Sequence, residues 1–155
     1  MAENVYDASF ITYANCSLDQ PTLERREFLG SLIQGISQII TGNDRLRWNK
    51  HLWQEYHDHV SECRNDVIDQ FFEILTSENA VQGKNSLRRQ DDDRAHQCNW
   101  PKHDRHLIAA AIGGAKVTIH VTEERLGRCA PDVKRKFQIK VNYVPPVLPD
   151  EEKDH

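Results

Sequence analysis

Residues 103–110, with the sequence HDRHLIAA, constrain the fold of this chain more than any other stretch. They predict an apolar, alanine-rich helix with an acid in its first turn, which Gly113 and Gly114 end. An apolar strand, residues 116–121, follows and leads into two further acids, Glu123 and Glu124. A helix that precedes a buried strand is typical of a parallel α/β sheet, in which ligands bind at the carboxyl ends of the strands. We therefore expect acidic side chains at a ligand site on that edge.

Asp104 is the most informative of these acids. In a helix from about residue 103 to residue 112, Asp104 shares a face with Ile108 and Ala111, which we expect to face the core. A carboxylate among apolar side chains is costly unless it is paired, hydrogen-bonded or bound to a cation. The alternative is an ordinary acid at a helix N-terminus, favoured by capping or by the helix dipole. The spacing alone leaves both interpretations open.

Two more acids occupy comparable places. Asp7 interrupts an N-terminal β-like run, and we expect it at the carboxyl end of a first strand, where Ser9 can orient it. An ordinary turn acid is the alternative for Asp7. Glu55 borders the buried stripe of a helix predicted from residue 50 to about residue 60, with Asn49 as its N-cap. Most helix glutamates are solvated, so Glu55 is the weakest of these acids taken singly.

The order and setting of these motifs resemble the PIN domain. The matching motifs are, in chain order, residues 6–9, 55–56, 103–111 and 121–126, and the resemblance extends from about Asn4 to Pro145. PIN domains are metal-dependent nucleases of about this length that act mostly on RNA. The resemblance implies that Asp7, Glu55 and Asp104 are catalytic acids that hold the metal.

The fourth acidic position departs from the family pattern, which usually has an aspartate two residues after the threonine. Glu124 stands at that place and Glu123 adjoins it, so we assign Glu124 by spacing and keep Glu123 in reserve. We expect Ser9 and Thr122 to support the acids through hydrogen bonds. The substitution by glutamate favours an alternative function, a PIN-like module with weakened catalysis that serves as a nucleic-acid-binding or assembly subunit.

The chemistry of the acids also indicates a nuclease, independently of the resemblance to the PIN domain. Clustered carboxylates suit hard cations such as Mg²⁺ or Mn²⁺, which activate water and stabilise charge on a phosphate. The sequence contains no Ser/His/Asp or Cys/His arrangement that would indicate nucleophilic catalysis, and no glycine-rich loop that would indicate nucleotide binding. We expect a metal-dependent endonuclease that cleaves single-stranded RNA, with DNA as an alternative substrate. The chain could be the toxin of a toxin–antitoxin pair, in which a small antitoxin protein covers the acidic site, or a stand-alone RNA-processing enzyme. The resemblance also implies that the chain could form a homodimer.

Basic and imidazole side chains near Asp104 are candidates for nucleic-acid contact. They are Lys102, Arg105, His103 and His106. A solvated polar surface is the alternative for each of them. A structural zinc site is a further interpretation, because His51, Glu55 and His59 lie four residues apart on one helix face, but this spacing matches no established zinc pattern.

Composition limits the class of protein. The chain has 155 residues, a net charge of −4 and a mean hydropathy of −0.71. We expect a single domain over residues 1–145, followed by an acidic, disordered tail over residues 146–155. The four cysteines are scattered, as is typical of reduced thiols in the cytoplasm. No apolar stretch approaches the roughly 20 residues of a membrane span, so we expect no membrane association.

Hydrophobic periodicity predicts the remaining elements. We expect a helix over about residues 21–40 and another over 65–77, and strands near 45–48 and 137–144. The first helix is expected to bury Leu29, Leu32, Ile33, Ile36 and Ile40. Residues 78–102 are interpreted as a long polar loop. Together these elements predict a three-layer α/β/α sandwich around a central parallel sheet of four or five strands.

Overall fold

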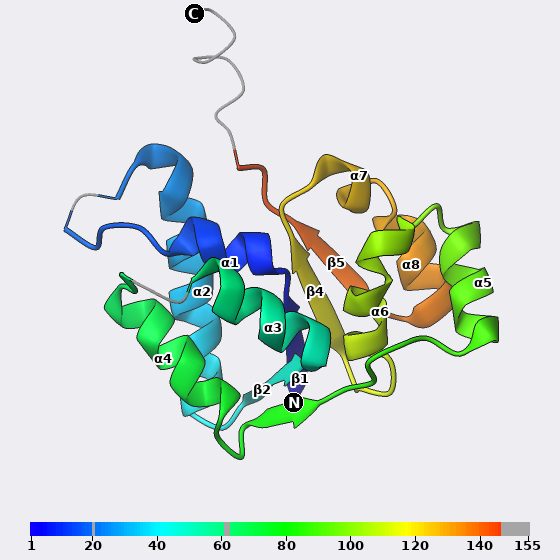
Figure 1. Cartoon of the computed structure of the whole chain (residues 1–155), viewed down its shortest axis with the longest axis horizontal. Helices are drawn as coiled ribbons and strands as arrows, with labels where there is room; N and C mark the ends of the chain where they lie inside the picture. Colours follow the sequence, from blue (N-terminus) through cyan, green and yellow to red (C-terminus); the bar gives the residue numbers. More distant parts are fainter. Residues whose placement is uncertain (20, 61–62, 147–155) are drawn as a thin grey trace, which may run out of the picture.

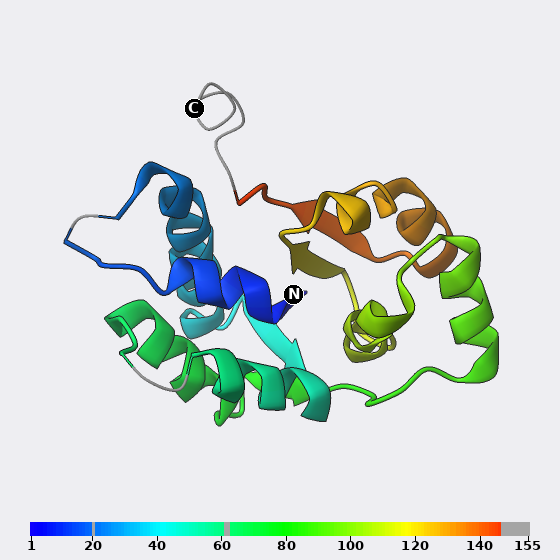
Figure 2. The same cartoon turned by 45° about the horizontal axis from the view of Figure 1, so that its top comes forward.

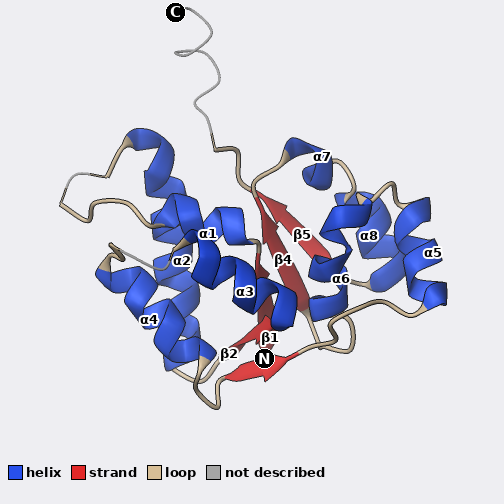
Figure 3. Ribbon diagram, in the orientation of Figure 1, coloured by secondary structure: helices blue, strands red, loops and turns tan. Residues whose placement is uncertain are grey.

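The chain folds around a five-stranded, fully parallel sheet with the strand order β3-β2-β1-β4-β5. The computed structural model describes residues 1–19, 21–60 and 63–146. The strands are β1 (Ala2–Tyr6), β2 (Asp44–Trp48), β3 (Ala80–Gln82), β4 (Val117–Val121) and β5 (Lys140–Tyr143), drawn as arrows in Figure 3. The expected α/β class with a central parallel sheet is confirmed, with the larger of the two expected strand numbers.

Helices cover both faces of the sheet (Figures 1 and 2). One face carries α1 (Ala8–Ala14), α2 (Leu23–Ile40), α3 (Lys50–His59) and α4 (Asp66–Leu75). The other carries α5 (Arg89–Gln97), the 3₁₀ helix η1 (Lys102–Asp104), α6 (Arg105–Ala111), α7 (Glu124–Gly127) and α8 (Ala130–Phe137). The strand order reverses between β1 and β4, so the connections that follow these two neighbours diverge to opposite faces. In open parallel sheets this point of reversal is where ligands bind.

The buried stripe of α2 differs in part from the expected one. Leu29, Leu32 and Ile36 are buried as expected, together with Phe28 and Ile39. The prediction for the other two isoleucines is wrong, since Ile33 is 47% exposed and Ile40 is 59% exposed. The stripe follows the face through residues 28, 32, 36 and 39, and both isoleucines lie outside it.

A buried arginine on β2 fixes the far end of α6. Arg47 donates through Nε to the Ala110 carbonyl oxygen at 2.8 Å and through Nη2 to the Ile112 carbonyl oxygen at 3.1 Å. Its Nη1 lies 3.3 Å from Glu3 Oε1. Gly113, with φ of +90°, then turns the chain towards β4. Because these contacts hold the C-terminal end of α6, its N-terminal end is fixed at the opposite edge of the sheet.

The prediction of a long polar loop over residues 78–102 is wrong. This segment contains β3, the edge strand beside β2, and the helix α5. Ala95 is the buried residue of α5, whose other side chains are polar, so the helix lacks the apolar stripe that periodicity detects. Asp91 and Asp92 in its first turn and Arg94 in its last turn favour the helix through its dipole instead.

Three other expectations concern membrane-spanning helices, the C-terminal tail and the cysteines. Within the described ranges, no helix has both the length and the apolar character that crossing a bilayer requires. The expected acidic tail is not tested, because residues 147–155 lie outside the described part of the chain. The four cysteines carry free thiols, and Cys98 and Cys129 are buried.

Candidate metal centre

A cavity of about 590 Å³ opens where the chain leaves β1 and β4. Asp7 and side chains of α1, α3 and the η1–α6 segment line it, together with Glu123 from the segment between β4 and α7. Its acidic lining residues are Asp7, Glu55, Asp104 and Glu123. Its imidazoles are His51, His59, His103 and His106. The three acids that the sequence singled out from distant segments therefore share one cavity.

Asp7 is positioned by both central strands. It directly follows β1, and its backbone N–H donates to the His120 carbonyl oxygen of β4 at 3.0 Å. Asp7 is the N-cap residue of α1, but its side chain makes no capping hydrogen bond. It accepts instead from Ser9 Oγ at 3.0 Å. Ser9 Oγ lies 2.7 Å from Thr122 Oγ1, and because Ser9 gives its only hydroxyl proton to Asp7, Thr122 is the donor to Ser9. The two expected supporting hydroxyls thus orient Asp7 in a chain.

The Asp7 carboxyl group is unusually easy to protonate. Burial is the largest cause that raises its pKa to about 6, with smaller contributions from the negative charges of Asp104 and Glu55, and the hydrogen bond from Ser9 opposes them. A carboxylate that is costly to ionise, yet surrounded by other carboxylates, is stabilised by a nearby positive charge.

Asp104 lies at the junction of η1 and α6. Trp100 Nε1 holds its backbone by donating to the Asp104 carbonyl oxygen at 2.8 Å. The side chain is buried and makes no capping hydrogen bond to α6, so a helix cap does not explain this acid. His103 Nε2 approaches Oδ2 to 3.3 Å without the alignment of a hydrogen bond, and Oδ2 has no partner. Burial, with Glu123 and Glu55 nearby, raises the pKa of Asp104.

Glu55 reaches the cavity from α3 and meets two imidazoles. Its Oε1 lies 3.0 Å from His106 Nε2 and 3.2 Å from His51 Nε2. The contact with His106 is the largest cause of a lowered pKa for Glu55. The expected N-cap of α3 is confirmed, since Asn49 Oδ1 accepts from the Leu52 N–H at 3.0 Å. Asn49 Nδ2 also donates to the His106 carbonyl oxygen at 2.9 Å, and this bond joins α3 to α6 beside the cavity.

Polar atoms without partners are concentrated in this cavity. Among the residues that the structure describes, the buried side-chain nitrogen and oxygen atoms that lack a hydrogen-bond partner are Glu55 Oε1, Asp104 Oδ2 and His106 Nε2. All three residues line the cavity, and they come from α3, η1 and α6. Buried polar atoms are nearly always satisfied, so their convergence marks this cavity as a candidate ligand site.

The fourth acidic position differs from the choice made by spacing. Glu123 lines the cavity and raises the pKa of Asp104, whereas Glu124 is exposed and does not line the cavity. The reason is the helix α7, which begins at Glu124 and turns the chain away from the end of β4. Glu123, the residue kept in reserve, is therefore the fourth carboxylate at this cavity.

The candidate nucleic-acid contacts divide between two cavities. His103 and His106 line the acidic cavity, whereas Lys102 and Arg105 line a neighbouring cavity of about 580 Å³, together with Arg125. Arg105 Nη1 is already paired with Asp92 Oδ1 at 2.6 Å, and its Nε donates to the Trp100 carbonyl oxygen at 3.1 Å. Lys102 is exposed and lies on the same short 3₁₀ helix as Asp104.

Sequence reasoning did not bring His51 and His106 together. The two rings stack with centroids 3.8 Å apart and planes 19° from parallel, although they come from α3 and α6. The helical spacing between His51 and Glu55 was a partial signal, and the sequence paired them with His59. His106 replaces His59 as the residue in contact with Glu55 Oε1, and only the packing of α3 against α6 shows this.

Comparisons of the chain with protein-family models, with curated proteins and with solved structures find no match. The α/β fold and the geometry of the cavity are therefore the basis of any functional assignment.

Proposed function

We propose that this chain is a metal-dependent nuclease of the PIN-like type, which hydrolyses phosphodiester bonds in single-stranded RNA. One observation carries the proposal. Asp7, Glu55 and Asp104 come from distant segments, converge on one cavity at the reversal of strand order, and include buried oxygens without hydrogen-bond partners.

The electrostatics of the cavity support a divalent cation. Asp7 and Asp104 have raised pKa values because burial, and to a smaller extent the negative charges of nearby carboxylates, disfavour ionisation. Oxygen ligands of this kind suit Mg²⁺ or Mn²⁺, and a bound cation would offset both costs. A merely structural acidic cluster would be expected to lie in solvent or to pair with lysine or arginine, and none of the lysines and arginines that the structure describes lines this cavity.

The residues of the chain take distinct roles in this proposal. Asp7, Glu55 and Asp104 would hold the cation, with Glu123 available as a fourth carboxylate. When bound, the ion supplies an activated water and neutralises charge on the phosphate. Ser9 and Thr122 keep the Asp7 carboxylate in one orientation.

A phosphate contact belongs at the mouth of the cavity. The His103 side chain is 75% exposed there and lies on the same 3₁₀ helix as Asp104, so it can donate to a phosphate oxygen or carry a proton. Lys102 and Arg125 extend the positive charge into the neighbouring cavity, which suits a strand that continues beyond the cleavage point. RNA as the substrate follows from the family resemblance, and the toxin role and the antitoxin partner stay expectations of that resemblance.

The proposal is tested by cleavage of a labelled single-stranded RNA with Mn²⁺ or Mg²⁺ and with chelator. We expect metal-dependent cleavage by the native chain and a loss of at least about 100-fold in Asp7→Asn and in Asp104→Asn. Asp58→Asn is the matched control, because Asp58 is exposed on α3, accepts a hydrogen bond from Gln54 and does not belong to the cavity lining among the described residues, so the activity of this variant should match that of the native chain. A single-stranded DNA of the same sequence separates the two substrate classes.

Equal activity in the native chain and in both cavity variants would refute the catalytic assignment. Absence of cleavage of RNA and DNA with either cation, together with retained RNA binding, would instead support the alternative of a PIN-like binding subunit.

A further inference from the structure

Two imidazoles and one carboxylate converge beside the aspartates. His51 Nε2, Glu55 Oε1 and His106 Nε2 all lie within 4.8 Å of one another. The Glu55 oxygen stands between the two nitrogens, at 3.2 Å from His51 and 3.0 Å from His106. His51 and Glu55 alone would be an ordinary pair on a helix surface. The third member comes from α6, and its side chain is only 7% exposed.

The contacts of His106 turn its Nε2 towards Glu55. Its Nδ1 lies 3.2 Å from the His103 carbonyl oxygen, which can only accept, so Nδ1 carries a proton. Nε2 faces Glu55 Oε1, and within the described part of the chain neither atom has a hydrogen-bond partner of good geometry. With its proton on Nδ1, the neutral ring offers the Nε2 lone pair, and a metal ion between the two atoms can take both as ligands.

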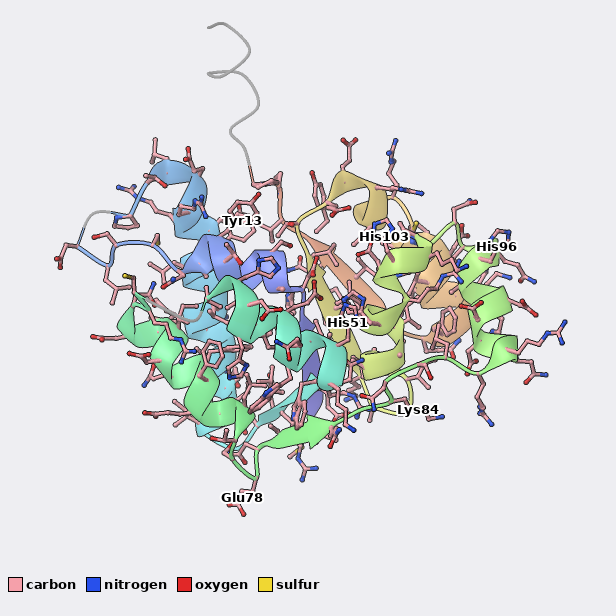
Figure 4. All side chains as sticks on the ribbon, viewed as in Figure 1. Tyr13, His51, Glu78, Lys84, His96 and His103 are labelled. Atoms are coloured by element: carbon pink, nitrogen blue, oxygen red, sulfur yellow. The ribbon has the colours of Figure 1, made fainter. Side chains whose placement is uncertain are left out.

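The contact between His106 Nδ1 and the His103 carbonyl oxygen is typical of a metal-binding histidine. Such a residue donates its other ring N–H to a carbonyl or carboxylate, which fixes the tautomer and the orientation of the ring. For ligands that lie about 2.0 to 2.1 Å from one ion, neighbouring ligand atoms are roughly 3 Å apart. The two measured separations from Glu55 Oε1 have this size. His51, labelled in Figure 4, is the most exposed of the three residues, with 49% of its side chain exposed.

We propose that His51, Glu55 and His106 form a binding site for a first-row transition-metal ion such as Zn²⁺, distinct in ligand chemistry from the aspartate site. Imidazole nitrogen selects zinc and its neighbours over Mg²⁺, which prefers oxygen. Glu55 belongs to both sets, so the two sites adjoin. This inference goes beyond the proposed nuclease function, because the ion binds whether or not nucleic acid is cleaved.

The test measures metal binding by the full-length, chelator-treated chain without nucleic acid. Calorimetry with Zn²⁺ and with Mg²⁺ gives the affinities, and visible absorption of bound Co²⁺ reports nitrogen ligation. We expect the native chain to bind Zn²⁺ at least about tenfold more tightly than Mg²⁺. His51→Ala and His106→Gln should each weaken Zn²⁺ binding by at least about tenfold and change the Co²⁺ spectrum.

Two controls isolate the imidazole ligands. His96→Ala removes an exposed imidazole on α5, far from His51 in Figure 4, and should leave Zn²⁺ binding unchanged. Asp7→Asn should weaken Mg²⁺ binding and preserve the Co²⁺ spectrum. His51 is half exposed, so His51→Ala is expected to fold, and circular dichroism checks this for both histidine variants.

Equal Zn²⁺ affinity in the native chain, His51→Ala and His106→Gln would overturn the proposal, as would Zn²⁺ binding no tighter than Mg²⁺ binding. The outcome separates from that of the nuclease assay. Histidine-dependent Zn²⁺ binding without any cleavage would leave this site standing, and Asp7-dependent cleavage with unchanged Zn²⁺ affinity in the histidine variants would leave only the nuclease.

Discussion

At the scale of single residues, Asp7 shows a conflict between stability and site chemistry. Its pKa is about 6 in the folded chain against 3.8 as the ordinary value. The folded state therefore binds the proton more tightly than the unfolded state does. Its contribution to stability is fully present below about pH 4 and is lost as the pH rises through about 6. At neutral pH the ionised Asp7 destabilises the metal-free chain.

Asp7→Asn should accordingly stabilise the metal-free protein at pH 7. Two units of pKa correspond to about 3 kcal/mol, and we expect an increase of about 2 kcal/mol in the free energy of unfolding, since the amide keeps the bond from Ser9 imperfectly. Urea unfolding in the presence of chelator measures it. Asp58→Asn, on the exposed face of α3, should change the value by less than about 0.5 kcal/mol. A destabilised Asp7→Asn would contradict the burial cost assigned to this carboxylate.

His120 has the opposite pH dependence. Burial, with a smaller contribution from the positive charge of Lys140, lowers its pKa to about 4. The ring stacks on Tyr6, and its two nitrogens bond Asn4 and Asn142. The folded state disfavours the charged ring, so this residue contributes stability that is present above about pH 6.5 and is lost as the pH falls towards 4. Over this window the contributions of Asp7 and His120 oppose each other.

The opposition predicts a difference between two stability profiles. The metal-free native chain should show a shallow dependence of unfolding free energy on pH between about 4 and 6.5, whereas Asp7→Asn should lose up to about 3 kcal/mol as the pH falls over that range. Urea titrations at several pH values measure both profiles. Adding His120→Gln to Asp7→Asn should flatten the profile again, and an unchanged slope in this double variant would contradict the role of His120.

At the scale of elements, Asn49 joins the two helices that carry the candidate metal ligands His51, Glu55 and His106. Its side-chain oxygen caps α3, and its nitrogen bonds the carbonyl oxygens of His106 and Lys84. Asn49→Asp retains the cap and loses both donors, whereas Asn49→Ala loses all three bonds. We expect Asn49→Ala to lower the free energy of unfolding by about 3 kcal/mol.

The aspartate variant separates the cap from the junction between α3 and α6. Because Asn49→Asp keeps the α3 cap, its far-UV circular dichroism should stay native, but its carboxylate would repel the carbonyl oxygens. Zn²⁺ affinity should therefore fall in Asn49→Asp through displacement of His106. Native Zn²⁺ affinity in Asn49→Asp would show that this bond does not position the site.

The longer elements with a clear apolar period could be predicted from the sequence, whereas the short helices α1, α7 and α8, the polar helix α5 and the short strand β3 were missed. The helices α3 and α4 begin at capping asparagines, whose side chains accept from Leu52 and Ile68, and both carry buried stripes. In α5 a single buried alanine leaves no stripe to detect, and β3 has only three residues. The exposed isoleucines of α2 show a further limit, because periodicity finds an apolar face without fixing which edge of it meets the core.

At the scale of the whole molecule, topology explains which part of the site could be predicted. Parallel strands deliver the residues that follow them to one edge, so Asp7 after β1 and an acid after β4 could be expected at one cavity without any knowledge of side-chain packing. Which of the two adjacent glutamates lines the cavity could not be predicted, since spacing favoured Glu124 and the structure places Glu123 there. The proximity of His106 to His51 depends on how α3 packs on α6 across the sheet edge. That contact is set by tertiary packing, which local sequence spacing does not encode.

The cavity also joins the two helical layers, and this predicts how a cation acts on the whole fold. Asp7 and Glu55 belong to the layer of α1 and α3, whereas Asp104 and His106 belong to η1 and α6 on the other face. A cation held by both sets would tie the layers together. Mn²⁺ at about 100 times its Kd should raise the free energy of unfolding by about 2.7 kcal/mol.

Hydrogen exchange locates this stabilisation. Amides of α3 and of the η1–α6 junction should gain protection together when Mn²⁺ is added to the chelator-treated chain, because ordering either side orders its ligand partner. In Asp104→Asn the gain at the η1–α6 junction should be lost first. Protection confined to one layer, or equal in the native chain and in Asp104→Asn, would mean that the cation does not bridge the two faces of the sheet.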